Sequence, residues 1–451
     1  MSLPKEVIEA LDSGSVEADE YRISDAWDGW LIYKNLIDTP TYRKKFFPYS
    51  KPQDPIIAEP IASSIINRLA SALRKGTTYS ATINGTDATD ELNALIEQLE
   101  WHDVTLDSLV KTLATGGQLF WLSIDELAKV RVDTIQPYYA GKVFSPTQRL
   151  LGFYQSFAMD SRTMLEPIDT YTHNEAQNIV RYVDEVSYMK WQNNTLIVNQ
   201  PHNLPFIPAV WTDSIDFDED GAYGMPYINR FKSMLLHLNS TLSQKQKALI
   251  FLQNIWIAKT DLVNGDSGEL VLTPDIINYV GPDGDLSQAV RNLDLSEETN
   301  QIAYLKRAIY KAAQVPMDDD LSTQGKVESG VALRILYAQL EEIIGRLRHM
   351  WSRAEEEVLK KAFRMQRLID GRTDPKDALH IEVVYNTDIV PQDEQHQLDI
   401  ELRLLENGLI RKESLIRKYN AASEDVDALL AEMDTPVPDV QQSPPPPNAA
   451  L

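Results

Sequence analysis

The sequence predicts an α+β protein that is mainly helical. Long stretches carry apolar residues at intervals of three and four, which is the period of one helical face. A central stretch instead carries short runs of β-branched and aromatic residues, as strands do. Apolar residues make up 43% and charged residues 24% of the 451 residues, so the chain is able to bury a core. This length allows two or three domains, or one large fold of several parts.

The longest periodic stretch begins after Ser329. Its apolar residues step by four, three, four, three and four positions: Leu336, Leu340, Ile343, Leu347, Met350 and Ala354. No proline lies between Ser329 and Asp370, so one helix of about 40 residues and about 60 Å is expected. Such a helix is typical of a strut in a large assembly, or of the core of a large α-rich domain.

The N-terminal part predicts helices. Residues 1–50 read as an aromatic-rich helical arm with a basic patch at Arg43, Lys44 and Lys45 beside Phe46 and Phe47. Aromatic residues interleaved with basic ones bind nucleic acid in some proteins. An arm that packs against a neighbouring subunit is the more common use of such a segment, and it is the one expected here. Further helices are expected over residues 55–75 and 89–115.

The central part, residues 117–211, predicts a mainly antiparallel sheet. Strand-like runs lie at 130–132, 179–183, 186–191 and 195–198, and Asn193–Asn194 is a plausible hairpin turn. Three prolines between Pro201 and Trp211 restrict that run to an extended connection or a sheet edge.

An acidic loop follows the sheet. Asp216, Asp218, Asp220 and Gly221 have the opening spacing of a calcium-binding loop. The twelfth position, which requires a bidentate glutamate, is Tyr227. An acidic loop in front of a helix is therefore expected, without a metal.

The second half alternates helices with short inserts. A helix is expected from Pro226 to about Ile250, then strands at 255–258 and 269–272, and a second helix from Ser296 to Gln314. A polar acidic loop joins this helix to the long one. A strand at 379–385 and three small helices within 392–434 follow, and the proline-rich tail 435–451 is expected to be disordered.

Charge and motifs exclude several function classes. The formal net charge of −24 disfavours bulk attraction to nucleic acid, and the lack of cysteine excludes disulfides and thiolate chemistry. The N-terminus lacks the apolar core of a signal peptide. The sequence contains no run of about 18 apolar residues, so no membrane span is predicted. Phosphate-binding, dinucleotide, zinc-protease and nucleophile-elbow motifs are absent, and the histidines are scattered. No catalytic residue, metal or cofactor is therefore predicted. A carboxylate-dependent hydrolase stays open as an alternative, because an acidic chain forms carboxylate pairs by chance.

The order of segments over roughly residues 55–390 resembles the portal proteins of tailed bacteriophages, especially those of long non-contractile-tailed phages. The resemblance rests on the order of several segments. These are the glycine-containing segment Gly221–Ile228 that leads into a helix, the part of that helix at residues 238–243, the compact insert after it, the short helix that ends before Val315–Pro316, and the Ser-Gly-Val-Ala-Leu segment at 329–333. The resemblance implies the following organisation in chain order. The wing covers residues 1–225, the first stem helix 226–250, the clip 251–293 and the second stem helix 294–314. The tunnel loop then covers 315–328, the long wing helix and the returning strand 329–391, the crown 392–434, and the proline-rich tail 435–451.

The resemblance also implies a function without catalysis. It predicts a ring of about twelve copies at one capsid vertex of the virion, assembled in the host cytoplasm, through which double-stranded DNA passes. The implied partners are a terminase packaging motor, a head-tail adaptor, and the major capsid and scaffolding proteins, with no membrane. The implied tunnel-loop residues are Pro316, Met317, Asp318, Asp319, Asp320 and Lys326. Candidate DNA contacts are Lys306, Arg307 and Lys311. The alternative is an acidic helical scaffold or adaptor that never touches DNA.

Overall fold

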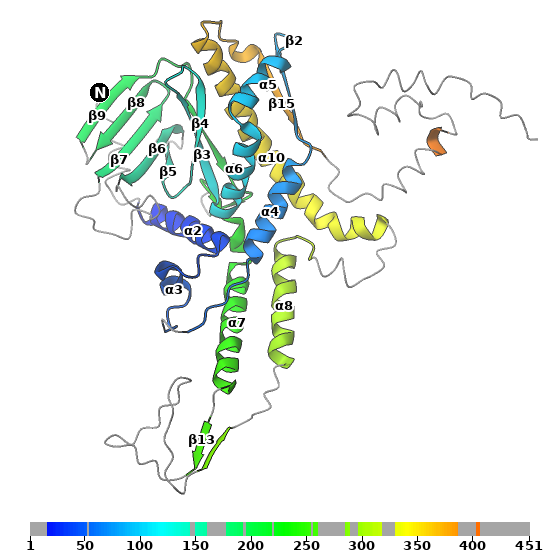
Figure 1. The fold of residues 1–451 in the computed structure, drawn as a ribbon. Coiled ribbons are helices and arrows are strands. Elements are labelled where there is room, and N and C mark those ends of the chain that lie inside the picture. The colour runs from blue at the N-terminus through cyan, green and yellow to red at the C-terminus, as the bar shows by residue number, and fades with distance from the viewer. Residues whose placement is uncertain are drawn as a thin grey trace, which may run out of the picture. The chain divides into compact units, whose positions relative to one another are not determined.

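The computed structural model describes residues 16–51, 54–144, 149–159, 177–192, 195–218, 221–253, 256–259, 285–288, 296–317, 330–386 and 403–405. The chain divides into two compact units, residues 1–326 with 335–389, and residues 327–334 with 390–451. Nearly all the described residues belong to the first unit, which mixes helices and strands as the residue patterns predict (Figure 1).

From Val16 onward, helices form most of the N-terminal part, as expected, and residues 1–15 of the expected arm lie outside the described residues. They are α2 (Val16–Lys34), α3 (Pro40–Phe46), α4 (Ile61–Arg74), α5 (Thr89–Gln98) and α6 (Trp101–Thr115). The single helix expected over 89–115 is two helices, because Glu100 adopts a left-handed conformation with φ of 50° and ends the first one. The helix expected over 55–75 begins only at Ile61, and the residues before it run alongside a later helix, α7 (Lys232–Gln253).

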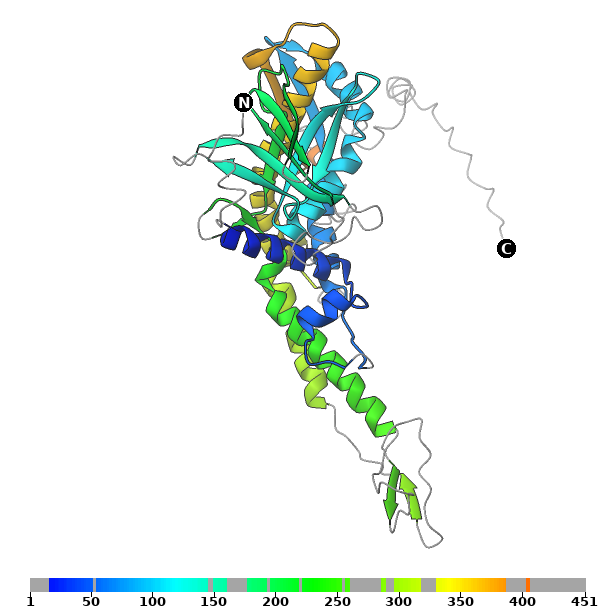
Figure 2. The same ribbon diagram turned by 90° about the vertical axis from the view of Figure 1, so that its left-hand side faces the viewer.

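The expected central sheet is two antiparallel sheets (Figure 2). One has the order β10-β3-β4, with β3 (Gly117–Ile124), β4 (Val130–Ile135) and β10 (Ala209–Asp213). The other runs β5-β6-β7-β8-β9, with β5 (Ala140–Phe144), β6 (Leu150–Met159), β7 (Gln177–Asp184), β8 (Ser187–Gln192) and β9 (Thr195–Pro201). The buried side chains of Leu119, Trp121, Phe153 and Val183 belong to one core cluster drawn from both sheets. A single sheet could not bury these apolar faces against each other.

A third sheet joins distant parts of the chain. The strand β15 (Leu379–Val384) pairs antiparallel with β1 (Thr78–Ile83), which also pairs with β2 (Thr86–Asp87). The strands β11 (Asp216–Phe217) and β12 (Gly224–Met225) form a two-stranded ribbon, and the acidic loop that follows the central sheet connects them. The sequence predicted β15 from its alternation, but not its partner, because pairing over such a separation leaves no local pattern.

The two middle helices are α7 (Lys232–Gln253) and α8 (Ser296–Ala312). The chain enters α7 through a 3-10 turn at Tyr227–Arg230 and a break at Phe231, so this helix begins later than its expected start at Pro226. Between the helices, β13 (Trp256–Lys259) pairs with β14 (Asp285–Gln288). The sequence predicted β13 and missed β14, and the strand expected at 269–272 lies outside the described residues.

The long helix α10 (Gly330–Ile369) has nearly the bounds that the sequence predicts. Its apolar stripe is buried, with Ile343, Leu347, Val358 and Ala362 at most 3% exposed. A short 3-10 turn at Lys376–Ala378 follows, leading into β15.

The centre of α10 carries a buried carboxylate, Glu355, that its periodicity does not reveal. It accepts two hydrogen bonds from Arg74, at 2.8 and 3.0 Å, and one each from Tyr79 at 2.7 Å, Trp101 at 3.1 Å and Tyr385 at 2.5 Å. Burial and the nearby carboxylate raise the pKa of the Tyr79 and Tyr385 hydroxyls, so both remain donors. This cluster ties α10 to α4, α6, β1 and the end of β15.

The expected crown and tail lie almost wholly outside the described residues, where only 403–405 are helical. No helix within the described ranges is both long and apolar enough to cross a bilayer.

Candidate functional site

The helices α7 and α8 lie side by side and run in opposite directions (Figures 1 and 2). Lys245 Nζ donates to Thr299 Oγ1 at 3.0 Å, and the His237 and Gln301 side chains meet at 3.2 Å. Leu235 and Leu238 of α7 and Leu305 and Ile309 of α8 are buried. The apolar face of each helix is therefore covered.

An extended segment, residues 54–59, contacts both α7 and α8. Asp54 forms an ion pair with Lys247 at 3.0 Å, and Ile57 N donates to Ser243 Oγ at 2.9 Å. Glu59 N donates to Asn239 Oδ1 at 3.2 Å, and the Glu59 carboxylate pairs with Lys306 at 2.8 Å. Lys306, a candidate DNA contact from the sequence, is thus half-buried and engaged within its own subunit.

The outer face of α8 carries the other two basic candidates. Arg307 and Lys311, four residues apart, are exposed on one helical face with Asn300 and Tyr304. Tyr304 is 69% exposed. Within the described part of the chain, neither Arg307 nor Lys311 has an ion-pair partner. The structure therefore brings Arg307 and Lys311 together and separates Lys306 from them.

The C-terminus of α8 fixes the start of the acidic loop that joins α8 to α10. Gln314 adopts a left-handed conformation with φ of 52°, and Val315 N donates to Tyr310 O while Gln314 N donates to Lys311 O, both at 3.1 Å. This pair of bonds is a Schellman motif, which ends a helix and turns the chain. Pro316 follows and is buried, and Met317 is half-buried.

Three side chains whose role here is not predicted from the sequence hold the start of this loop in place. Arg68 of α4 donates to Pro316 O at 2.7 Å, and Tyr227 donates to Ala313 O at 2.8 Å. Arg230 donates to the Gln314 side chain at 3.1 Å. Burial raises the pKa of Tyr227 to about 12, which keeps it a donor. These contacts cross more than 80 residues, so no local signal marks them. The remaining predicted loop residues, Asp318, Asp319, Asp320 and Lys326, lie outside the described residues.

In the acidic loop between β11 and β12, the two described carboxylates of the predicted calcium-loop spacing, Asp216 and Asp218, make internal contacts, and Asp220 lies outside the described residues. Asp216 accepts two hydrogen bonds from Arg230, at 2.6 and 2.7 Å. Asp218 Oδ1 accepts from the backbone of Ala222 at 2.9 Å and Tyr223 at 3.3 Å, which closes a tight turn. Among the residues that the structure describes, no three or more histidine, aspartate or glutamate side chains gather as metal ligands would.

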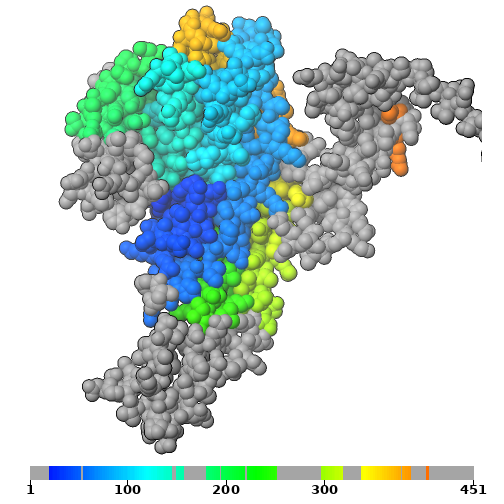
Figure 3. Space-filling view, viewed as in Figure 1, coloured from blue at the N-terminus to red at the C-terminus, as the bar shows by residue number. Residues whose placement is uncertain are grey.

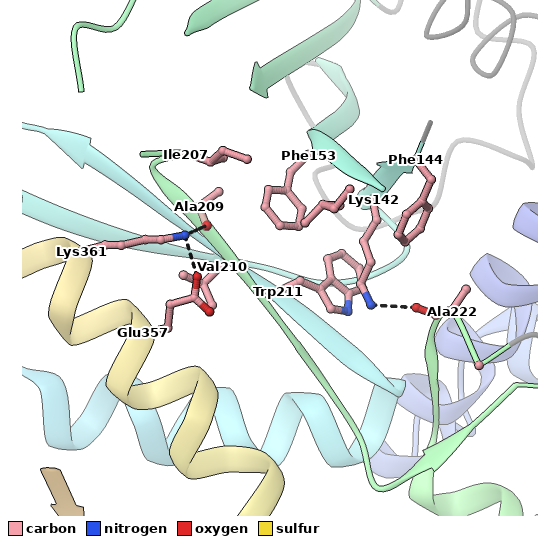
Figure 4. A pocket seen from close by; sticks show the side chains of 12 residues that line it. Lys142, Phe144, Phe153, Ile207, Ala209, Val210, Trp211, Ala222, Glu357 and Lys361 are labelled. Atoms are coloured by element: carbon pink, nitrogen blue, oxygen red, sulfur yellow. Dashed lines mark hydrogen bonds and ion pairs between the residues drawn. The ribbon is translucent and has the colours of Figure 1, made fainter. Parts of the chain in front are cut away.

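A pocket of about 860 Å³ lies beside β10, with walls from β5, β6 and α10 (Figure 4). Phe153 and Trp211 give it an aromatic lining, and Lys142 and Lys361 give it charge. Lys142 Nζ contacts Asp213 at 2.8 Å and donates to Ala222 O at 2.7 Å, while Lys361 Nζ contacts Glu357 and Ala209 O, both at 2.9 Å. Both lysines therefore have structural partners, and Lys361 covers part of the open edge of β10.

Comparison with known proteins identifies the family. The model "Phage portal protein, SPP1 Gp6-like" matches residues 57–435, which include α4 to α10 and β15. A search of curated protein sequences finds no match to this chain.

Solved structures of gene transfer agent (GTA) particles are similar to this chain. A chain in the neck of a native GTA particle, computed with C12 symmetry, is 13% identical with a TM-score of 0.42; the alignment covers 84% of this chain and 91% of that one. A chain in the neck of an empty GTA particle, computed with C6 symmetry, is 13% identical with a TM-score of 0.43, covering 85% and 93%. On the family match over most of its length, this chain belongs to the SPP1 Gp6-like family of phage portal proteins.

Proposed function

We propose that this protein forms a closed ring of about twelve copies at one capsid vertex of a phage virion, with double-stranded DNA passing through the centre. The observation that carries the proposal is the family match over residues 57–435, which spans both paired helices and the long helix. In this proposal α7 and α8 are the stem, and the acidic loop after Pro316 is the tunnel loop at the narrowest part of the channel.

The charge distribution supports a channel that lets DNA slide. At −24 per chain, a ring of twelve would carry on the order of −290 formal charges, which repel phosphate. A few exposed cations on the wall would then make weak, salt-dependent contacts. Arg307 and Lys311 suit this role, because they are exposed on one face of α8 without ion-pair partners in the described residues.

The other regions would serve docking. Residues 251–293, between the two stem helices, would be the clip that contacts the terminase motor and later the head-tail adaptor. The remaining surfaces would meet the major capsid and scaffolding proteins. The ring itself would supply the channel and docking surfaces while the motor does the work, so no catalytic residue is assigned.

Native mass spectrometry of the purified full chain tests the proposal. We expect a closed ring of about twelve subunits. A monomer or dimer at micromolar concentration would favour an acidic scaffold or adaptor instead. Turnover of plasmid DNA with Mg²⁺, abolished by a single Asp→Asn change, would favour a hydrolase.

A further inference from the structure

A strained backbone position lies where α8 ends. Gln314 adopts the left-handed conformation, with φ of 52°. Glycine or asparagine usually occupies this position at a helix end, because other side chains bring their β-carbon too close to the following carbonyl oxygen. The flanking residues Ala313 and Val315 are 0% and 4% exposed. Such a conformation persists only where the surroundings favour it, so the contacts of Gln314 must offset its steric cost.

The side chain of Gln314 supplies one such contact. Its Oε1 accepts a hydrogen bond from Arg230 Nη1 at 3.1 Å. A glycine would adopt the same conformation more easily, but it could not make this bond. The chain thus has, at the end of α8, a residue that is unfavourable for the backbone and that bonds Arg230 through its side chain.

Arg230 joins three separate segments of the chain. Its Nε and Nη2 donate to Asp216 of β11 at 2.6 and 2.7 Å, and its guanidinium lies over the Tyr227 ring, 4.7 Å from the ring centre. A planar guanidinium can donate in several fixed directions and stack on a ring at the same time, which an ammonium cannot do. One side chain therefore links β11, the entry to α7 and the end of α8.

The carbonyl groups on both sides of Gln314 are also held. Tyr227 donates to Ala313 O at 2.8 Å, and Arg68 of α4 donates to Pro316 O at 2.7 Å. In Figure 3 the surface of residues 296–317 (yellow-green) adjoins that of the N-terminal helices (blue). The chain before and after the turn is thus anchored, and Arg230 acts on the strained residue between the anchors.

Loss of the Arg230 bond would change the path of the chain after α8. Gln314 would then favour the right-handed or extended regions that suit residues with a β-carbon. The helix cannot simply continue, because Pro316 lacks an N–H group and disfavours a helical conformation for Val315. The hydrogen bond from Val315 N to Tyr310 O, at 3.1 Å, belongs to the strained turn and would be lost with it.

We propose that Arg230 is a latch for the turn at Gln314, and that it sets the direction in which the acidic loop leaves α8. Asp216 holds the guanidinium in place, so the ribbon of β11 and β12 supports the latch. The inference rests on the proposed function, in which this loop is the tunnel loop, because it names what positions that loop. Arg230 and Gln314 are positioning residues here, and neither is assigned a contact with DNA.

Hydrogen–deuterium exchange of the full chain, read by mass spectrometry on fragments that contain Val315, tests the latch. Gln314→Ala keeps the steric cost and loses the Arg230 bond, so exchange at Val315 should be about fivefold faster or more. Gln314→Gly loses the same bond but adopts the turn without that cost, so exchange should stay within about twofold of the natural protein. Equal acceleration by the two changes would overturn the proposal.

The arginine is tested in both backgrounds. Arg230→Gln alone should speed exchange at Val315 about as much as Gln314→Ala does. In the Gln314→Gly background the same change should alter exchange at Val315 by less than about twofold, because no latch is left to lose. An arginine that serves only general packing would act equally in both backgrounds, and that result would contradict the latch.

A matched arginine provides the control. Arg364 also grips an aspartate with two hydrogen bonds, to Asp374, both at 2.8 Å. Arg364→Gln should leave exchange at Val315 unchanged. Acceleration there by Arg364→Gln would show that Val315 reports general loss of stability, and the latch would be wrong. If Arg230→Gln does not fold, the comparison of Gln314→Ala with Gln314→Gly still decides.

The outcome is separable from that of the proposed function, because every contact of the latch lies within one chain. A ring whose Gln314 variants exchange alike would overturn the latch and leave the ring. A monomer whose Gln314→Ala and Gln314→Gly variants differ as expected would overturn the ring and leave the latch.

Discussion

The inner side of α10 and the outer face of α8 use charge in opposite ways. Glu355 of α10 is buried and accepts five hydrogen bonds from four residues of the same chain. Arg307 and Lys311 of α8 are exposed, and the described residues offer them no ion pair. Both helices follow an apolar period, so the difference lies in what surrounds each charge.

This difference separates residues of the fold from residues available to a partner. A buried charge is tolerated only when partners replace its lost hydration, so every contact of Glu355 serves the fold. An exposed cation is hydrated already and contributes little to folding. Mutations at the two places should therefore affect different measurements.

The largest expected effect is at Glu355. Glu355→Ala should lower the free energy of unfolding by about 3–5 kcal/mol, because it leaves Arg74 buried without its carboxylate. Urea unfolding followed by tryptophan fluorescence measures it. Glu341→Ala is the matched control, an exposed carboxylate on the same helix, and should change stability by less than about 0.5 kcal/mol. Equal effects of the two changes would contradict a special role for the buried cluster.

A middle-sized effect is expected at Arg68, which joins α4 to the loop entry through Pro316 O at 2.7 Å. Arg68→Ala should cost about 2 kcal/mol, as the loss of a charge-assisted hydrogen bond to a buried carbonyl does. Thermal unfolding at fixed subunit concentration measures it. Lys75→Ala, an exposed cation just after α4, provides the control and should have no measurable effect.

A smaller effect depends on pH. Hydrogen bonds from Arg364 lower the pKa of Asp374. A depressed folded pKa stabilises the fold above the unfolded pKa, and this contribution is lost as pH falls through the folded pKa. Asp374→Asn should therefore cost no more than about 1 kcal/mol at pH 7, because solvent screens this pair, and should converge with the natural protein in acid.

Glu356 should show the opposite dependence of stability on pH. Burial raises the pKa of its carboxyl. A raised carboxyl pKa favours the fold at low pH, and that advantage disappears as pH rises through the folded pKa. Glu356→Gln should thus be more favourable, relative to the natural protein, at pH 7 than at pH 4. Parallel pH profiles for the Asp374 and Glu356 variants would show that these environments are wrongly assigned.

The smallest effect on folding is expected on α8. Arg307→Gln with Lys311→Gln should change the free energy of unfolding by less than about 0.5 kcal/mol. In the proposed channel, the same pair should weaken DNA retention and flatten its dependence on salt. Lys306→Gln should do the reverse, with a small loss of stability from the broken Glu59 pair and no change in DNA retention. Retention that responds equally to all three positions would contradict the separation of Lys306 from the exposed face.

Local patterns predicted the elements whose signal is periodic. The bounds of α10 and the strand β15 follow from periodic apolar residues, because a helix or strand buries one regular face. The start of α8 follows from the capping residue Ser296 and from Glu297 and Glu298 in the first turn. Pairing could not be predicted in the same way. The split into two sheets, the partner of β15 and the missed strand β14 depend on segments far apart in the chain.

The candidate site was predictable only in part. The basic residues of α8 were visible in the sequence. The sequence did not show that Glu59 pairs with Lys306, or that Arg307 and Lys311 have no ion-pair partner among the described residues. Arg68, Tyr227 and Arg230 gave no signal, since each acts on a backbone or side chain brought near by folding.

The sequence by itself determined the helical framework, the acidic charge and the ordered segments that place this chain in its family. Only the tertiary structure decided which charges are consumed within the subunit and which are left exposed. The reason is physical: periodicity is a property of neighbouring residues, whereas desolvation and ion pairing depend on every group that packing brings within a few ångströms.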